Sequence, residues 1–298
     1  MSTRAEKYEY LARIKGFIEL YSSKETTNIL DGSYRSVYRG RSLDFDDLRE
    51  YAYGDNVRDV DWKSSSKAGK LLIRRFVAEK KHNVLFVLDS GEKMKADTSA
   101  GEDKVQVALD TLGVIAYLVN QAGDDYALMQ AGPGGMYFTN FSSGNRHLEE
   151  MLREAERNLS SGGEGRPLAD VLEYTAENLT RRMVICVITD LAGIAGISEK
   201  LRRKLVVNND VLMVDIDDAF LYGDRVFDVG ASRYEEGLLF GGKKLARAER
   251  EEREKRLAQA EAGFRSQRIT MTVIGSEKEI IGKVIELFDR HRLGQARA

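Results

Sequence analysis

Two continuously apolar runs, each ending in an aspartate, constrain the fold of this chain more than any other feature. The run VLFVLD ends at Asp89, and the run VICVITD ends at Asp190. An unbroken apolar run is typical of a strand that is covered on both faces, as in a parallel sheet. Ligands of open α/β sheets bind beyond the carboxyl ends of such strands. We therefore expect the two carboxylates to face one site.

The segments around these runs alternate between strand and helix patterns. Helices are expected near 105–123, 145–159, 168–182, 197–205 and 277–290, and further strands in YALMQAG, GMYFTNF, DVLMVDID and ITMTVIG. This alternation predicts a doubly wound, Rossmann-like α/β domain over 81–298, with a mostly parallel sheet and helices on both faces. Residues 1–80 are expected to add an amphipathic helix over 5–22 and an irregular charged segment, both packed on that domain.

The charged segment over 43–71 alternates charges of both signs and contains two tyrosines and a tryptophan. A catalytic centre, a nucleic-acid patch and a structural clasp could each explain it. Arginine–carboxylate pairing favours the clasp, with the rings of Tyr51, Tyr53 and Trp62 buried against the neighbouring sheet. The basic stretch Lys63 to Lys81 is interpreted as a charged rim, because it lacks interleaved exposed aromatics. With a formal net charge of -2, no nucleic-acid partner is expected.

Composition and motif spacing exclude several other classes of site. The single cysteine, Cys186, rules out an internal disulfide and lies in an apolar run, which predicts a buried, inert thiol. The chain has no P-loop, no GxGxxG after a strand, no paired histidines and no GxSxG. No apolar run approaches the ~20 residues that a membrane span needs, so we expect a cytoplasmic protein without membrane contact.

The segment 243–264, KKLARAEREEREKRLAQAEAGF, carries opposite charges at three- and four-residue spacing. Such spacing is typical of a solvated helix with ion pairs along its surface. A docking helix for a partner is the alternative.

The charged segment and the strand after it resemble a known family. SYRSVYRGRSLDFDDLREYAYGDNVRDVDWKSSSKAGKLLIRRF followed by VLFVLDSGEKM is similar to the bacterial and archaeal domain of unknown function 58 proteins, in which this signature precedes a von Willebrand factor A-like domain. The signature positions here are Arg49, Glu50, Tyr51, Gly54, Asp55, Arg58, Asp61 and Trp62. Many members carry two N-terminal membrane helices, and this chain looks like the short, soluble form.

The resemblance implies a non-enzymatic role. Family members are thought to act with MoxR-type AAA+ ATPases, as adaptor or chaperone-like components that help to assemble or activate other proteins. The implied partners are therefore a MoxR-type ATPase and an unidentified client protein.

The resemblance also implies a candidate metal site. Related von Willebrand domains hold Mg²⁺ through Asp-x-Ser-x-Ser after the first strand, a later threonine and an aspartate after the fourth strand. Asp89 and Asp190 match the aspartates, but Gly91 and Lys93 stand at the serine positions and the threonine position falls near Pro167. We predict a degenerate site in which the Lys93 ammonium neutralises the two aspartates. No cofactor is expected, and bound Mg²⁺ is the disfavoured alternative.

Two functions of other classes stay open at this point. One is a divalent-metal-dependent hydrolase or phosphotransfer enzyme that uses Asp89 and Asp190, with Asp215 or Asp217 as a further carboxylate. The other is a nucleic-acid-binding module that uses the basic stretch Lys63 to Lys81. Divalent-metal-dependent turnover would identify the first, and a steep salt dependence of affinity would identify the second.

Overall fold

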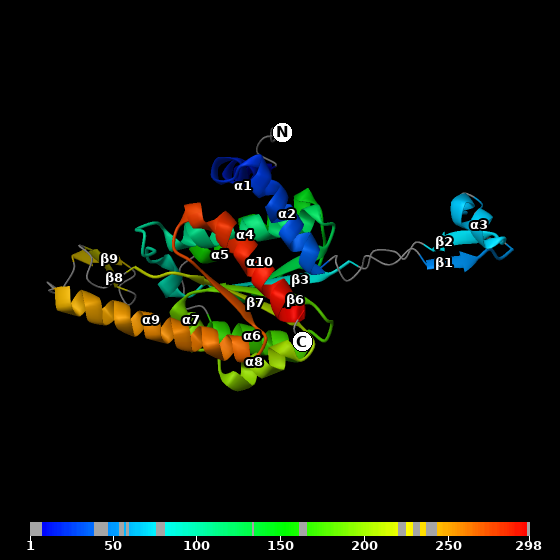
Figure 1. The fold of residues 1–298 in the computed structure, drawn as a ribbon. Coiled ribbons are helices and arrows are strands. Elements are labelled where there is room, and N and C mark those ends of the chain that lie inside the picture. Colours follow the sequence, from blue (N-terminus) through cyan, green and yellow to red (C-terminus); the bar gives the residue numbers. More distant parts are fainter. Residues whose placement is uncertain are drawn as a thin grey trace.

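The computed structural model describes residues 8–38, 47–53, 57, 60–75, 81–132, 134–160, 166–219, 225–228, 233–236 and 243–296. Its centre is a six-stranded sheet in the order β10-β7-β6-β3-β4-β5 (Figure 1). All neighbouring strands are parallel except the hairpin of β4 and β5. The predicted fold class, an α/β protein with a mostly parallel sheet, is confirmed. The strands of this sheet are β3 (Asn83–Leu88), β4 (Asp125–Gly132), β5 (Gly135–Phe138), β6 (Val184–Thr189), β7 (Asp210–Ile216) and β10 (Thr270–Ile274).

Helices cover both faces of this sheet (Figure 1). One face carries α1 (Glu9–Tyr21), α2 (Lys24–Tyr38), α4 (Lys104–Gln121), α5 (Asn145–Ser160) and α10 (Ile280–Ala296), the last preceded by the 3-10 turn η4 (Glu277–Glu279). The opposite face carries α6 (Leu168–Asn178), α7 (Leu191–Ala195), α8 (Glu199–Val206) and α9 (Lys243–Ser266). A two-stranded hairpin of β8 (Arg225–Asp228) and β9 (Arg233–Glu236) precedes α9.

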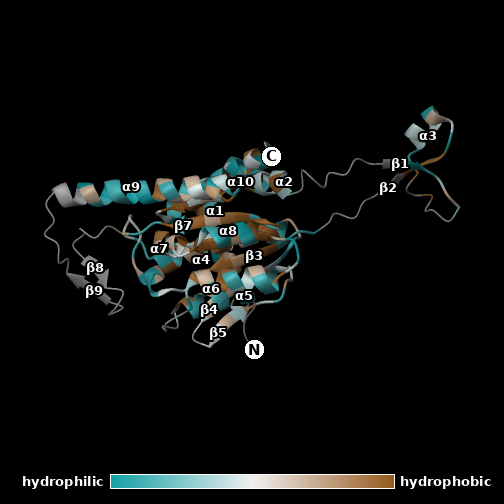
Figure 2. Ribbon diagram, turned by 90° about the horizontal axis from the view of Figure 1, so that it is seen from below, coloured by the Kyte–Doolittle hydropathy of each residue, from teal (hydrophilic) through white to brown (hydrophobic). Residues whose placement is uncertain are grey.

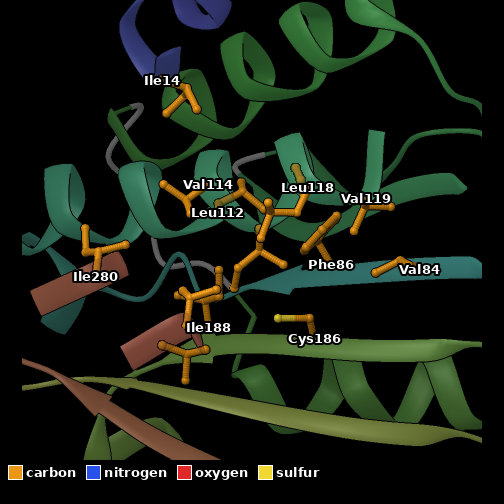
Figure 3. Close-up of a cluster of buried hydrophobic side chains, with 14 of the residues drawn as sticks. Ile14, Val84, Phe86, Leu112, Val114, Leu118, Val119, Cys186, Ile188 and Ile280 are labelled. Carbon is orange, nitrogen blue, oxygen red and sulfur yellow. The ribbon is translucent and has the colours of Figure 1, made fainter. Parts of the chain in front are cut away.

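Successive residues of the central strands enter two separate hydrophobic cores. Val84, Phe86 and Leu88 of β3 point to the α4 side, and Leu85 and Val87 point to the α6 side. This two-residue period explains why β3 and β6 are apolar throughout, since both faces of the sheet are buried. Figure 3 shows the core on the α4 side, where Cys186 of β6 lies among aliphatic side chains. Burial raises the pKa of the Cys186 thiol to about 12, as an inert structural cysteine requires.

The N-terminal helices belong to the core on the α4 side. Leu11, Ile14, Phe17 and Ile18 of α1 are buried there, as the spacing predicts. Helix α2 was not predicted, although its buried residues have the three- and four-residue spacing of one helix face: Leu30, Ser33, Tyr34, Val37 and Tyr38. Its tyrosines pack on α10: the ring of Tyr34 lies edge-on to that of Phe288, with centroids 5.4 Å apart.

An ion pair between a half-buried arginine and a buried aspartate joins α1 to α4. Arg13 Nη2 donates to Asp110 Oδ1 at 2.6 Å, and Gln106 Nε2 donates to Asp110 Oδ2 at 2.7 Å. Burial opposes the charged form of Asp110 and outweighs the attraction of Arg13, which raises the pKa of this carboxyl from 3.8 to about 6.

This raised pKa predicts a pH-dependent contribution to stability. The folded protein holds the Asp110 proton more tightly than the unfolded chain, so the stabilisation is full below about pH 4 and is lost as the pH rises through about 6. Between these limits, the free energy of unfolding of the wild type should fall by up to about 3 kcal/mol relative to Asp110→Asn. Urea unfolding of both proteins from pH 4 to 7 measures this difference. Identical pH profiles would contradict the assignment.

The family signature folds into a small unit of its own, which we call the signature unit. It consists of the antiparallel strands β1 (Asp47–Glu50) and β2 (Leu72–Arg75) with α3 (Trp62–Ala68). The N-terminus of α3 is capped by Asp61, whose side chain accepts from the Ser64 backbone N–H at 2.9 Å. Among the described residues, Lys70 pairs with Glu50 across the unit. Gly54, Asp55 and Arg58 lie outside the described residues.

The aromatic rings of the signature unit are not buried as predicted. Tyr53 is fully exposed and Trp62 is 64% exposed, whereas Tyr51 is partly buried. Both figures that show the whole fold draw the unit to one side of the α/β body (Figures 1 and 2). The clasp hypothesis assumed that aromatic rings must be buried against the sheet, and this assumption is wrong for Tyr53 and Trp62. The boundary near residue 80 stays a prediction.

Helix α9 agrees with the prediction of a solvated helix. Ion pairs four residues apart lie along its exposed surface: Arg247 with Glu251, Arg256 with Glu252 and Arg265 with Glu261. Figure 2 shows the helix as mostly hydrophilic. Phe264 is its one fully buried side chain among the residues whose burial is described. In the described part of the chain, no helix combines the length and the apolar character needed to cross a membrane.

Candidate functional site

The aspartates that end β3 and β6 lie together, because these two strands are neighbours in the sheet. Asp89 follows β3 and Asp190 follows β6 at the same edge. The Thr189 hydroxyl, one residue before Asp190, donates to Asp89 Oδ2 at 2.6 Å. Further aspartates lie at the end of β7, the next strand, and directly after it. We call this set the carboxylate rim; its members are Asp89, Asp190, Asp215, Asp217 and Asp218.

Asp89 is almost completely buried, and its carboxylate accepts hydrogen bonds from two donors. Besides the Thr189 hydroxyl, the Gly91 backbone N–H donates to Asp89 Oδ1 at 2.9 Å. Burial raises the pKa of Asp89 in spite of these bonds, and the negative charge of Asp190 adds to the increase. The backbone of Gly193 lies close to the Asp89 carboxylate: a Cβ at that residue would be 2.7 Å from Asp89 Oδ2.

Asp190 has both carboxylate oxygens occupied. It caps the N-terminus of α7, where Oδ1 accepts from the Gly193 N–H at 2.8 Å. Oδ2 accepts from Lys104 Nζ at 2.9 Å. At 2% exposure, Asp190 is out of reach of solvent, and Lys104 supplies its counter-charge.

The ammonium of Lys104 connects three loops of the rim. Lys104 is the first residue of α4, and its side chain is 0% exposed. Nζ donates to Asp190 Oδ2 at 2.9 Å, to Asp218 Oδ1 at 2.5 Å and to the Lys93 carbonyl at 3.0 Å. A lysine ammonium has three donors, and each has an oxygen acceptor here. Burial opposes the ammonium, but the charges of Asp190 and Asp218 outweigh it and raise the pKa of Lys104.

The prediction that Lys93 neutralises the two aspartates is therefore wrong. Lys93 lies in the 3-10 turn η3 (Glu92–Lys95), and its side chain is exposed. Only its backbone carbonyl reaches the rim, as an acceptor for Lys104. The neutralising lysine comes from the helix that follows this turn. One feature of the sequence indicated this residue: Lys104 is the only cationic residue in the mostly apolar stretch KVQVALDTLGVIAYLVNQ.

Asp215, near the end of β7, and Asp217 and Asp218, directly after it, form the second half of the rim. The guanidinium of Arg253, from α9, pairs with the Asp217 carboxylate and donates to the Asp218 carbonyl at 2.5 Å. Asp215 is 2% exposed, and its Oδ1 has no hydrogen-bond partner among the described residues. Burial raises the pKa of Asp215 well above its ordinary value, and Asp218, Asp217 and Asp190 reinforce the increase. A protonated Asp215 is the form that this environment favours.

The residues present do not fit the Mg²⁺ site that the resemblance implies. Gly91 contributes an N–H rather than a hydroxyl oxygen. Pro167 lies exposed at the start of α6 and has no side-chain oxygen that could bind a metal ion. Ser90 turns toward β4, where its hydroxyl donates to the Ala131 carbonyl at 2.6 Å. Among the described residues, no three His, Cys, Asp or Glu side chains are arranged to hold a metal ion. An octahedral Mg²⁺ shell would lack most of its protein oxygens here.

A comparison with protein-family models decides the family. The model described as "Protein of unknown function DUF58" matches residues 47–234, which is more than half of the chain. The chain belongs to the DUF58 family. The match begins at the first residue of β1, so the signature unit is part of what this DUF58 protein shares with its family.

Curated relatives of this DUF58 protein carry no functional description. It is 22% identical over 202 residues to the uncharacterized protein Rv1480 of Mycobacterium tuberculosis strain H37Rv and, equally, to the uncharacterized protein Mb1516 of Mycobacterium bovis. The match covers 67% of this chain and 63% of each relative. The chain thus spans slightly less than two thirds of the length of these relatives.

Solved structures similar to this DUF58 protein include von Willebrand factor A domains. BatB from Bacteroides thetaiotaomicron has a TM-score of 0.45 at 13% identity, covering 73% of this chain and 100% of that one. An aerotolerance-related membrane protein from Bacteroides fragilis has a TM-score of 0.46 at 12% identity, covering 70% and 99%. A von Willebrand factor type A protein from Catenulispora acidiphila has a TM-score of 0.42 at 11% identity, covering 72% and 43%.

Proposed function

We propose that this DUF58 protein is a non-enzymatic, cytoplasmic adaptor that binds a client protein and acts with a MoxR-type AAA+ ATPase. The observation that carries the proposal is that most of the carboxylates of the rim are held by hydrogen bonds and ion pairs within the protein. Thr189 and Gly91 hold Asp89, Lys104 holds Asp190 and Asp218, and Arg253 holds Asp217. These contacts are internal, so the rim serves to fix its loops rather than to act on a substrate.

The same contacts argue against the hydrolase and phosphotransfer alternative. A general base must come within hydrogen-bond reach of the proton that it abstracts. Asp190 and Asp215 are each 2% exposed, and both oxygens of Asp190 are already occupied. The proposal therefore predicts no divalent-metal-dependent turnover.

The signature unit offers a surface suited to a protein partner. It exposes four large apolar or aromatic side chains: Tyr53, Val57, Trp62 and Leu71. Tryptophan and tyrosine are the residues that most often dominate binding energy at protein interfaces. Since the unit lies within the family match, it is our candidate surface for the ATPase.

One observation gives the nucleic-acid alternative more weight than the sequence did. Trp62 is exposed next to Lys63 and on the same short helix as Lys67, and stacking aromatics beside basic residues suit single-stranded nucleic acid. Acidic residues of the unit, Glu50 and Asp61 among them, oppose this use. An oligonucleotide binding series at increasing salt should show no specific affinity, and a steep loss of affinity with salt would favour this alternative instead.

The test of the adaptor role is an affinity pull-down from native extract, followed by binding measurements with the purified ATPase. The immobilised protein should retain a MoxR-type AAA+ ATPase, and nucleotide-free arms with Mg²⁺ and with chelator should retain it equally. ATP is added in a separate arm, because the ATPase itself needs Mg²⁺. Trp62→Ala should reduce the affinity at least tenfold, about 1.4 kcal/mol. Val207→Ala, at an exposed apolar residue just after α8, should not change it. If none of the arms retains an ATPase, the proposal is contradicted.

A further inference from the structure

Among the described residues, two cationic side chains pair with the carboxylate rim: Lys104 and Arg253. In the part of the chain that the structure describes, the Lys104 ammonium is the group to which loops after three strands converge: Asp190 after β6, Asp218 after β7, and the carbonyl of Lys93 in the turn after β3. The acceptors are two carboxylates and one carbonyl, all oxygens. Carboxylate and carbonyl oxygens are also the ligands that hard divalent cations prefer.

The position of Lys104 in the fold makes this contact rigid. Lys104 opens α4, which is buried along most of its length in the core on the α4 side. Asp103, immediately before it, caps the helix by accepting from the Val105 N–H at 2.8 Å. The Lys104 N–H donates to the Ala96 carbonyl at 3.1 Å, which ties the helix start to the end of the η3 turn. The ammonium is therefore delivered from a fixed backbone, and the loops are ordered around it.

We propose that the Lys104 ammonium is a built-in cation that does, in this protein, what a divalent ion would otherwise do at this edge of the sheet. It holds the loops after β3, β6 and β7 in one arrangement, and this arrangement is independent of dissolved metal ions. The inference concerns the internal structure of the rim and does not rest on the ATPase partner.

The distances from Lys104 Nζ to its three acceptor oxygens indicate which ions could replace the ammonium once the lysine side chain is removed. The three oxygens lie 2.5–3.0 Å from Nζ. Ca²⁺ binds oxygens at about 2.3–2.6 Å in a flexible shell, whereas Mg²⁺ requires about 2.0–2.1 Å and near-octahedral order. Shortening Lys104 to serine leaves these oxygens with room for an ion and its waters. We expect Ca²⁺ to fit this space better than Mg²⁺.

The experiment compares thermal unfolding of the full chain with and without added ions. The wild type should show no change in Tm between chelator and 10 mM Ca²⁺ or Mn²⁺. Lys104→Ser should unfold at a lower temperature in chelator, and millimolar Ca²⁺ should raise its Tm by roughly 5 °C or more. Mn²⁺ should give an altered electron paramagnetic resonance spectrum with Lys104→Ser and only the aquo-ion spectrum with the wild type.

Three further variants test whether a rise in Tm with Ca²⁺ comes from an ion bound in the place of the Lys104 ammonium. Lys104→Met fills the space without a charge and should show no rise in Tm with Ca²⁺. Lys104→Ser with Asp190→Asn removes a ligand and should also lose the rise. Lys95→Ser removes a nearby lysine that pairs with Glu92 at 2.7 Å, and should behave as the wild type with and without ions.

Either of two results would overturn the proposal. One is an ion-dependent rise in Tm in the wild type that is lost in Asp190→Asn, since the rim would then hold a metal besides Lys104. The other is a Lys104→Ser protein that Ca²⁺ and Mn²⁺ do not stabilise, including one that is insoluble both with and without these ions. Failure of the ATPase pull-down would leave this result unaffected, so the two proposals can fail separately.

Discussion

Replacement of Lys104 by methionine is expected to lower the free energy of unfolding by about 3–5 kcal/mol, the cost of breaking a buried ion pair by removing one partner. Methionine has nearly the length of the lysine stem, so the packing of α4 is preserved and the change is mainly electrostatic. Asp190, at 2% exposure, would lose the counter-charge that Lys104 supplies, and the Lys93 carbonyl would lose its donor. Urea unfolding at pH 7, in the presence of chelator, measures the difference.

A double-mutant cycle assigns this cost to the charge on Asp190. Asp190→Asn alone also removes half of the ion pair and should be destabilising. The double variant Lys104→Met with Asp190→Asn leaves no unpaired charge on Asp190, so its loss should be smaller than the sum of the two single losses by at least about 1 kcal/mol. Additive losses, or a Lys104→Met protein as stable as the wild type, would show that the ammonium contributes only packing.

The position of the site could be predicted from the sequence because the pattern that indicates it lies within a few consecutive residues. An apolar run followed by an aspartate is contained within seven or eight residues, and parallel neighbouring strands then bring Asp89 and Asp190 to the same edge. The buried thiol of Cys186 and the ion pairs of α9 were predictable for the same reason. Each follows from residues close together in the chain.

The identity of the neutralising lysine was not predictable in this way. Lys93 lies four residues after Asp89, and Lys104 lies fifteen residues after it, so proximity in sequence favoured the wrong residue. The η3 turn directs the Lys93 side chain outward, and the helix start returns Lys104 to the rim. The partners of Lys104, Asp190 and Asp218, are 86 and 114 residues away, a distance at which no local pattern reports pairing. A buried lysine is also rare, and only its paired carboxylates make it tolerable.

The aromatics of the signature unit show a second limit of sequence reasoning. A hydrophobicity pattern predicts burial, and for Tyr53 and Trp62 that prediction fails because few other apolar side chains surround them. The described residues between Asp47 and Arg75 form two short strands and one short helix, which is too little to enclose several large rings. Exposed rings in a segment that the family shares are more informative about binding than about folding.

Gly193→Ala is expected to destabilise the protein by about 3 kcal/mol, although the substitution adds a single methyl group. The reason is space rather than backbone conformation, since a Cβ at Gly193 would lie 2.0 Å from Thr189 Oγ1 and 2.7 Å from Asp89 Oδ2. Both side chains are buried and bonded to each other, so one of them must move. The cost combines overpacking, about 1–3 kcal/mol, with a weakened bond to a buried carboxylate. Chemical unfolding of the variant and the wild type measures it.

Two comparisons make this prediction specific to the rim. Gly282→Ala, on the exposed side of α10 with no atom within 4 Å of the new Cβ, should instead stabilise the protein by up to about 1 kcal/mol. In a Thr189→Ala background, the nearest obstructing atom is gone, and Gly193→Ala should cost clearly less than it does in the wild type. An equal cost in both backgrounds would mean that the methyl group strains some other part of α7. The close contact between Gly193, Thr189 and Asp89 would then not be what fixes the loop after β6 against the loop after β3.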